Sequence, residues 1–135
     1  LQRACILHDI SLMAYPTHLQ KGQSSYMSAK ERNAYHQHPR LSAEIIANLE
    51  EFSEIAEIVR VHHENVDGSG FAGIKGSDLP LEAKMIRICD YYDEEETYNK
   101  SAHQNTLAYM KMYRGSWFDE YCFDEFFAMM SSLKK

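Results

Sequence analysis

Apolar residues recur along the chain with the spacing of a helix, and the alternation typical of a half-buried strand is almost absent. The clearest case follows Ser53, where one helical face at positions i, i+3, i+4 and i+7 carries Ile55, Ile58, Val59 and His62. Because the other members of this face are apolar, the spacing places His62 toward the interior. The hydrophobic pattern therefore predicts an all-α fold.

Capping signals predict where several helices begin. Ser28 is followed three residues later by Glu31, which indicates a capping box and a helix that runs to about residue 37. Pro39 suits the first turn of a second helix, which we expect to end near residue 51. Ser53 is expected to cap a third helix, and Ser101 to open a later one with a second capping box.

The remaining segments predict more helices and one loop. Residues 1–9 have the pattern of a helix end, residues 80–95 have helical spacing, and residues 118–133 form an aromatic-rich final helix. A helix that opens at Ser101 should close at Gly115. The glycines between residues 67 and 76 favour turns, so we predict a loop of defined shape there.

Composition narrows the classes of protein. With 135 residues, the chain suits a single domain, and 44% apolar and 25% charged residues are ordinary for a globular protein. No apolar run approaches the roughly 18 residues of a membrane span, so we expect no membrane insertion and a cytoplasmic location. A net charge of −6 argues against long nucleic acids as partners. We expect the three cysteines to be reduced core residues.

Two dipeptides carry the candidate chemistry. His8 and Asp9 offer an imidazole nitrogen and a carboxylate oxygen at one helix end, a pair that zinc, iron or manganese accepts. His62 and His63 point about 100° apart on a helix, so both reach one metal only near a helix end or distortion. An isolated histidine is more often an ordinary core or surface residue. We assign that role to His18, His36 and His103.

A buried aspartate completes the candidate cluster. Asp90 lies between apolar neighbours, and burying its charge is costly unless it is paired or binds a metal. A hydrogen bond to a neighbouring helix is the alternative role for Asp90. The full set of candidate metal ligands is His8, Asp9, His38, His62, His63 and Asp90.

The order of these motifs resembles the HD-GYP family. The resemblance rests on His8-Asp9, His38-Pro39, His62-His63-Glu64, Asp67-Gly68-Ser69-Gly70, Pro80-Leu81, Asp90-Tyr91-Tyr92-Asp93 and Trp117-Phe118-Asp119. It implies an all-α HD-superfamily helical bundle of roughly five to seven helices. Residues 1–135 would form a single HD-GYP-like domain, a fragment that lacks its upstream helices, including a further histidine ligand.

The resemblance implies a metal-dependent phosphodiesterase that hydrolyses cyclic di-GMP to pGpG or GMP. Two divalent transition-metal ions would serve the reaction, iron or manganese with zinc as the alternative. Asp9 would bridge both ions. His8 and Asp90 would bind the first ion, and His38, His62 and His63 would bind the second. The implied catalytic residues are Asp9 and His8. The implied substrate-binding residues are Asp67, Gly68, Gly70, Phe71 and Lys75.

Three departures from the family pattern leave other functions open. Leu12 stands where the family's HDIGK segment has lysine, and Gly70-Phe71-Ala72 replaces the family's GYP. Glu96 stands where the family usually has an arginine-rich RPYR stretch. The alternatives are a catalytically impaired module that binds metal, nucleotide or a signalling partner, and a phosphohydrolase with a different substrate. An upstream sensor or receiver domain is compatible with each of these functions.

Overall fold

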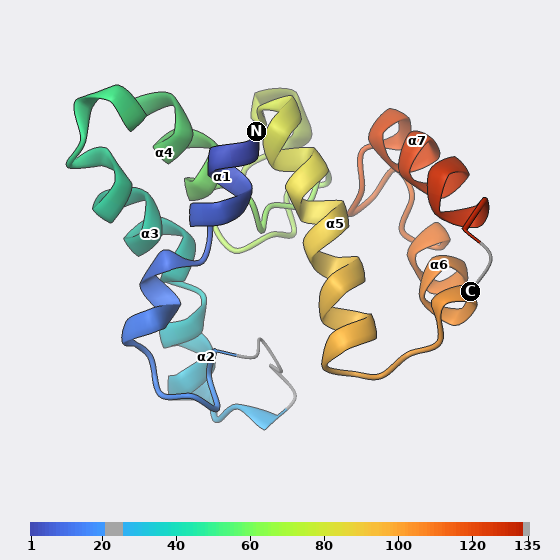
Figure 1. Cartoon of the computed structure of the whole chain (residues 1–135), viewed down its shortest axis with the longest axis horizontal. Coiled ribbons are helices and arrows are strands. Elements are labelled where there is room, and N and C mark those ends of the chain that lie inside the picture. Colours follow the sequence, from blue (N-terminus) through green and yellow to red (C-terminus); the bar gives the residue numbers. More distant parts are fainter. Residues whose placement is uncertain (21–25, 134–135) are drawn as a thin grey trace. The chain divides into compact units, whose positions relative to one another are not determined.

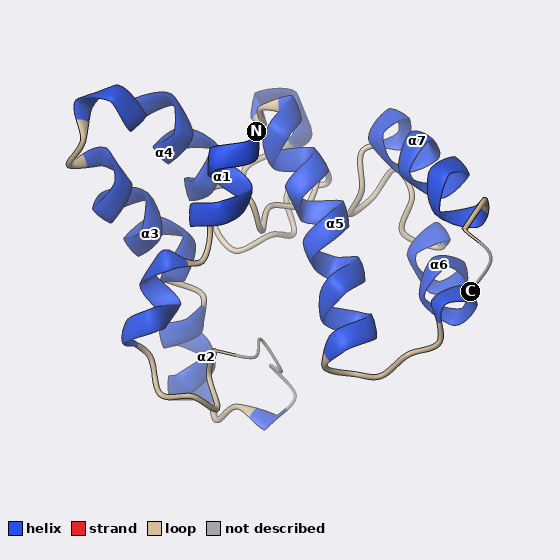
Figure 2. Cartoon of the chain, in the orientation of Figure 1, coloured by secondary structure: helices blue, strands red, loops and turns tan. Residues whose placement is uncertain are grey.

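A computed structural model describes residues 1–20 and 26–133. These residues form helices, turns and loops, and none of them lies in a strand (Figures 1 and 2). The prediction of an all-α fold is therefore confirmed. No helix in the described part of the chain has the length and apolar character to cross a membrane. The chain divides into two compact units, Leu1–His62 and His63–Lys135, and the expectation of a single domain stays a prediction.

The first unit is built from short helices. Its elements are α1 (Gln2–Leu7), η1 (Ile10–Ala14), α2 (Ala29–Tyr35), α3 (His38–Ala47), η3 (Glu50–Phe52) and α4 (Ser53–Arg60). Helix α3 packs against α4 and η1, and α1 packs against α4. A buried hydrogen bond ties η1 to α3, since the amide of Ser11 donates to Oγ of Ser42 at 3.1 Å. Asp9, just before η1, lies beside His38 at the start of α3 and His62 beyond the end of α4.

The helix starts in this unit test the capping predictions. The capping box is confirmed, because the Ser28 hydroxyl accepts from the amide of Glu31 and the Glu31 carboxylate accepts from the amide of Ser28. The predicted cap at Ser53 is wrong. Ser53 already has helical backbone angles, and the helix instead follows directly from η3 with Phe52 at the N-cap. Helix α3 also ends earlier than expected, at Ala47.

The second unit has longer helices around an aromatic core. Its elements are η4 (Gly76–Asp78), α5 (Leu81–Thr97), α6 (His103–Lys111) and α7 (Glu120–Ser131). Helix α5 packs against both α6 and α7. The core residues that these helices share are Ile88, Tyr92, Leu107, Met110, Phe118, Cys122, Phe123, Phe126 and Met130.

Two starts in this unit differ from expectation. The predicted cap at Ser101 is wrong, because α6 begins after Ala102 and the Ser101 hydroxyl instead donates to the Glu95 carboxylate at 3.2 Å. Asp119 caps α7 by accepting from the amide of Cys122, a cap that the sequence patterns did not predict. Gly115 has a positive φ of 80° and lies in the turn before α7, beyond the end of α6.

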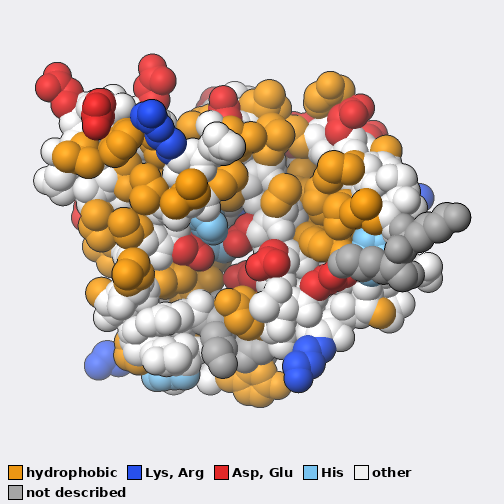
Figure 3. All heavy atoms as spheres, in the orientation of Figure 1, with side chains coloured by type: hydrophobic (Ala, Val, Ile, Leu, Met, Phe, Trp, Pro, Cys, Tyr) orange, Lys and Arg blue, Asp and Glu red, His pale blue; other side chains and the backbone are white. Residues whose placement is uncertain are grey.

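The surface is consistent with the acidic composition. On the face drawn in Figure 3, acidic side chains are more evident than those of Lys and Arg. All three cysteines are free thiols. The expectation that they are all core residues is wrong, since Cys5 and Cys89 are exposed and only Cys122 is buried, on the inner face of α7.

Candidate metal centre

In the first unit, the candidate ligands lie where helices end. His8 follows the last residue of α1, and Asp9 immediately precedes η1. His38 is the first residue of α3, and His62 lies just beyond the end of α4. His38 and His62 are fully buried, which confirms that His62 points inward as its helical spacing predicted. Helix ends suit this task because each break in the helix redirects one side chain toward its neighbours.

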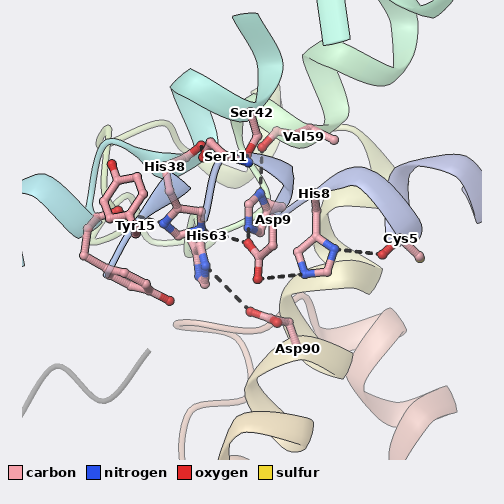
Figure 4. A network of polar contacts seen from close by, with 12 residues as sticks. Cys5, His8, Asp9, Ser11, Tyr15, His38, Ser42, Val59, His63 and Asp90 are labelled. Carbon is pink, nitrogen blue, oxygen red and sulfur yellow. Dashed lines mark hydrogen bonds and ion pairs between the residues drawn. The ribbon is translucent and has the colours of Figure 1, made fainter. Parts of the chain in front are cut away.

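The Asp9 carboxylate is the centre of this group (Figure 4). Its Oδ1 lies 3.1 Å from Nε2 of His38 and 3.6 Å from Nε2 of His62. Its Oδ2 lies 3.5 Å from Nε2 of His8. One ligand atom each from Asp9, His38 and His62 falls within 4.8 Å of the others, which is close enough for a single cation to contact all of them.

The three histidines are held by the same hydrogen bond. Nδ1 of each ring lies within 2.7–2.8 Å of the backbone carbonyl three residues earlier in the chain. The accepting carbonyls belong to Cys5 for His8, Tyr35 for His38 and Val59 for His62. Because a carbonyl can only accept, Nδ1 carries the proton in each ring. In the neutral ring, Nε2 therefore presents its lone pair toward Asp9.

The charges of this group favour a bound cation. Burial alone would raise the pKa of Asp9, but the neighbouring side chains of His38, His62 and His8 hold that pKa well below its usual range, so Asp9 is a carboxylate. Burial lowers the pKa of His62, which favours its neutral form. A carboxylate then faces imidazole lone pairs, an arrangement that a shared cation stabilises. Imidazole nitrogen and carboxylate oxygen are ligands for zinc, iron and manganese, and the hydrogen bonds from Nδ1 are typical supports of metal-bound histidine.

In the second unit, two more candidate ligands face each other. Nε2 of the buried His63 lies 3.7 Å from Oδ2 of Asp90, which projects from α5 (Figure 4). The ring of Phe71 stacks on His63 with centroids 4.7 Å apart and an interplanar angle of 22°. Phe71 is partly exposed at 36%. The structure thus pairs Asp90 with a histidine and places an accessible aromatic ring beside that pair.

Glu64 shapes the loop that carries Phe71. Its carboxylate is buried and accepts from the amides of Ala72 at 2.6 Å and Ile74 at 2.9 Å. Two charge-assisted hydrogen bonds from one side chain hold the backbone on both sides of Gly73. The prediction of a loop of defined shape is confirmed, and Glu64 is the residue that accounts for much of that shape.

The predicted substrate-binding residues occupy this loop. A Cβ atom at Gly70 would lie 2.5 Å from Cα of Glu64, so only glycine permits this close approach. Gly68 has a positive φ of 83°, and the Asp67 carboxylate accepts from the amide of Ser69 at 2.9 Å. Lys75 is exposed at the far end of the loop. Their role in binding substrate stays a prediction.

Comparison with known proteins identifies the family. Residues 1–121 match the HD domain. This chain belongs to the HD-domain family. This chain is similar to the cyclic di-GMP phosphodiesterase response regulator RpfG of Xanthomonas campestris pv. campestris. The two are 30% identical, and the match covers 92% of this chain and 34% of RpfG.

Two further relatives of this chain come from Vibrio cholerae serotype O1. A probable cyclic di-GMP phosphodiesterase is 30% identical over 92% of this chain and 31% of its own length. The 3'3'-cGAMP-specific phosphodiesterase 3 is 28% identical over 69% of this chain and 20% of its own length. The resemblance to HD-GYP phosphodiesterases is confirmed by these matches. The HD domain spans about a third or less of the curated relatives that it matches.

The departures from the HD-GYP pattern have structural roles in this HD domain. Leu12 is 5% exposed and belongs to a buried cluster with Leu19, Met27 and Tyr35. The Glu96 carboxylate accepts from the Tyr92 hydroxyl at 2.5 Å, and Nδ1 of His103 lies 2.6 Å from the same hydroxyl. Leu12 therefore contributes to a buried cluster, and Glu96 to a hydrogen-bonded contact between α5 and α6.

A hydrogen bond between Arg87 and Asn65 was not predicted from the sequence. Arg87 donates from Nε to Oδ1 of Asn65 at 3.0 Å, and its guanidinium lies over the rings of Tyr91 and Phe118. Asn65 in turn donates to the Ser69 hydroxyl, so the pair connects α5 with the loop. The sequence carries no spacing signal for this contact, because 22 residues separate the two side chains.

Proposed function

We propose that this HD domain is the catalytic part of a metal-dependent phosphodiesterase that hydrolyses a cyclic dinucleotide. The observation that carries the proposal is the convergence of His38 and His62 on Asp9, with both Nε2 lone pairs directed at one carboxylate oxygen. The substrate class follows from relatives named as cyclic di-GMP and cGAMP phosphodiesterases. Cyclic di-GMP is the substrate that we propose first, with pGpG or GMP as product.

We further propose that the domain holds two divalent transition-metal ions, iron or manganese, with zinc as the alternative. The proposed ligands are His8, Asp9, His38, His62, His63 and Asp90. Within each unit, the distances among these side chains and their donor types support this proposal. His62 and His63 are consecutive, so the two sets of ligands are joined by one peptide bond. When bound, such ions polarise phosphate oxygens and lower the pKa of water.

The protein's own side chains would orient the reacting groups. Asp9, as a carboxylate with two oxygens facing different histidines, is suited to contact both ions, and His8 would hold one of them beside the reacting phosphate. The exposed ring of Phe71 offers a stacking surface for a guanine base. Lys75 supplies a positive charge at the end of the same loop for a phosphate oxygen.

The proposal is tested by metal content and product formation. We expect the chain, expressed with iron or manganese, to carry metal by plasma emission and to convert cyclic di-GMP to pGpG or GMP. Asp9→Ala should lose both metal and product, because the carboxylate serves each ion. His18→Ala is the matched control, since His18 lies at the surface beside Glu31 and is not a proposed ligand. Unchanged metal content in Asp9→Ala would contradict the ligand assignment.

A catalytically impaired binding module is the second candidate function. The observation that favours it is the burial of Leu12 at the position where the HD-GYP pattern has a lysine, since no cation stands there. This candidate predicts that calorimetry detects binding of cyclic di-GMP to the metal-loaded chain while no linear product accumulates. Turnover at ordinary enzyme rates would exclude it. A signalling partner and an upstream sensor or receiver domain stay predictions under both functions.

A further inference from the structure

A pocket of the second unit is lined by residues of α5, of α6 and of the segment between them, and by none of the proposed metal ligands. It has a volume of about 410 Å³. Its lining residues are Tyr91, Glu95, Ser101, Asn105, Thr106 and Tyr109. This lining combines a carboxylate, two phenol rings, an amide and two aliphatic hydroxyls, and none of the described residues that form it is Lys or Arg.

The Glu95 carboxylate gives this pocket a negative charge. Its Oε1 accepts from the side-chain amide of Asn99 at 2.9 Å, and its Oε2 accepts from the Ser101 hydroxyl at 3.2 Å. Both donors are neutral, so they orient the carboxylate without cancelling its charge. Each carboxylate oxygen can accept more than one hydrogen bond, so the Glu95 carboxylate can also accept from a charged donor in the pocket.

Two tyrosines line the pocket with Glu95. Burial, followed by the charge of Glu95, raises the pKa of Tyr91. The hydrogen bond between the Tyr109 and Tyr113 hydroxyls is the main cause of the raised pKa of Tyr109, with the charge of Glu95 contributing. The carboxylate therefore acts on both phenols. The Arg87 guanidinium already lies over the ring of Tyr91, whereas the Tyr109 ring is 43% exposed. Tyr109 thus offers the accessible aromatic surface.

Thr106 lines the pocket and carries a buried hydroxyl group. This residue is 2% exposed, and its buried Oγ1 has no hydrogen-bond partner among the described residues. A buried hydroxyl without a partner lowers the stability of the fold. A ligand that donates a hydrogen bond to Oγ1 from within the pocket would recover that cost. The adjacent carboxylate selects for a donor that is also positively charged.

We propose that this pocket binds a small organic cation with a primary ammonium group. The ammonium pairs with Glu95, donates to the hydroxyl of Thr106 and lies against the ring of Tyr109, where a cation is attracted to the aromatic face. A nucleotide is disfavoured because its phosphates would meet the Glu95 carboxylate with no cation in the lining. The site is independent of the proposed phosphodiesterase chemistry, and none of its residues is a proposed metal ligand.

Titration of the chain with butane-1,4-diamine, followed by two-dimensional NMR, tests this proposal. We expect saturable shifts of the amides of residues 91–109. Glu95→Gln should weaken binding about tenfold or more, because the ion pair is lost while the side-chain shape is kept. Thr106→Val, which replaces only the hydroxyl by a methyl group, should weaken binding by a smaller factor. Binding should also weaken with added salt.

Asp93→Asn is the matched control for the local charge. It makes the same change of charge two residues before Glu95, on a side chain that does not line the pocket. We expect the affinity of the Asp93→Asn variant for butane-1,4-diamine to stay within about twofold of the affinity of the unsubstituted chain. Absence of saturation, equal affinity in Glu95→Gln, or an equal loss in Asp93→Asn would each overturn the proposal. Tighter binding of GMP than of the diamine in this pocket would also overturn it.

Discussion

At the scale of single residues, the hydrogen bond shared by His8, His38 and His62 decides what the metal centre can do. Each ring donates from Nδ1 to a backbone carbonyl, so its orientation is fixed before any ligand arrives. The Asp9 carboxylate then meets nitrogen lone pairs in place of N–H groups. The cluster is consequently prepared for a cation and is a poor hydrogen-bonding network on its own.

This arrangement predicts the histidine tautomers of the metal-free chain. The neutral rings of His38 and His62 should carry the proton on Nδ1, because a backbone carbonyl accepts from that nitrogen. His18 is the internal control with the opposite tautomer, since its Nε2 lies 2.9 Å from the Glu31 carboxylate. Long-range proton–nitrogen NMR spectra of the chelator-treated chain distinguish the two forms. A proton on Nε2 of His38 or His62 would contradict the lone-pair argument.

Leu12 gives a second prediction at the residue scale. Leu12→Lys restores the charge that the HD-GYP pattern has at this position, but it places an ammonium in a cluster with Leu19, Met27 and Tyr35. We expect the free energy of unfolding to fall by about 2 kcal/mol or more in urea titrations. Met13→Lys changes the next residue, which is 83% exposed, and should alter stability by no more than about 0.5 kcal/mol. Equal stability of the two variants would show that Leu12 is not a core residue.

At the scale of elements, helix starts and the glycine-rich loop depend on single carboxylates. Glu64 holds the loop by accepting two backbone amides, and Asp119 caps α7 while its other oxygen binds Lys84 at 3.1 Å. Each of these side chains satisfies donors that the local backbone leaves open. The boundaries of the elements therefore reflect particular polar contacts as much as the apolar pattern.

The capping box of α2 gives a prediction at this scale. Hydrogen bonds from Ser28 are the main cause that lowers the pKa of Glu31 from 4.5 to about 2. Because the folded pKa is depressed, this contribution to stability is complete above about pH 4.5 and is lost as the pH falls toward 2. Ser28→Ala should raise the midpoint of the Glu31 carboxyl titration, followed by NMR. It should also cost about 1 kcal/mol of stability at pH 7.

Ser53→Ala is the matched control for that experiment. The same substitution at the start of α4 should have little effect on stability, because the Ser53 side chain makes no capping hydrogen bond. A loss as large as that of Ser28→Ala would mean that Ser53 does cap its helix. An unchanged Glu31 midpoint in Ser28→Ala would contradict the assigned cause of the shift.

At the scale of the whole molecule, the sequence predicted features that depend on local patterns. The helical face that directs His62 inward and the reciprocal cap of Ser28 each follow from residues within about two turns of one another. The caps at Ser53 and Ser101 failed because the conformation of the preceding residues decides which side chain meets the open amides. Burial of Leu12 was not predictable for a related reason, since residues 7 to 23 positions away surround it.

Metal binding should change the stability of the whole chain. A ligand that binds only the folded state raises the free energy of unfolding by about 2.7 kcal/mol at 100 times its dissociation constant. We expect manganese to raise the urea midpoint of the chain relative to a chelator-treated sample. The increment should disappear in Asp9→Ala, because the carboxylate is central to the cluster, and persist in Asp78→Ala, whose side chain is exposed. If Asp9→Ala keeps the full increment, the stabilising metal binds elsewhere, and the assignment of Asp9 as the shared ligand fails.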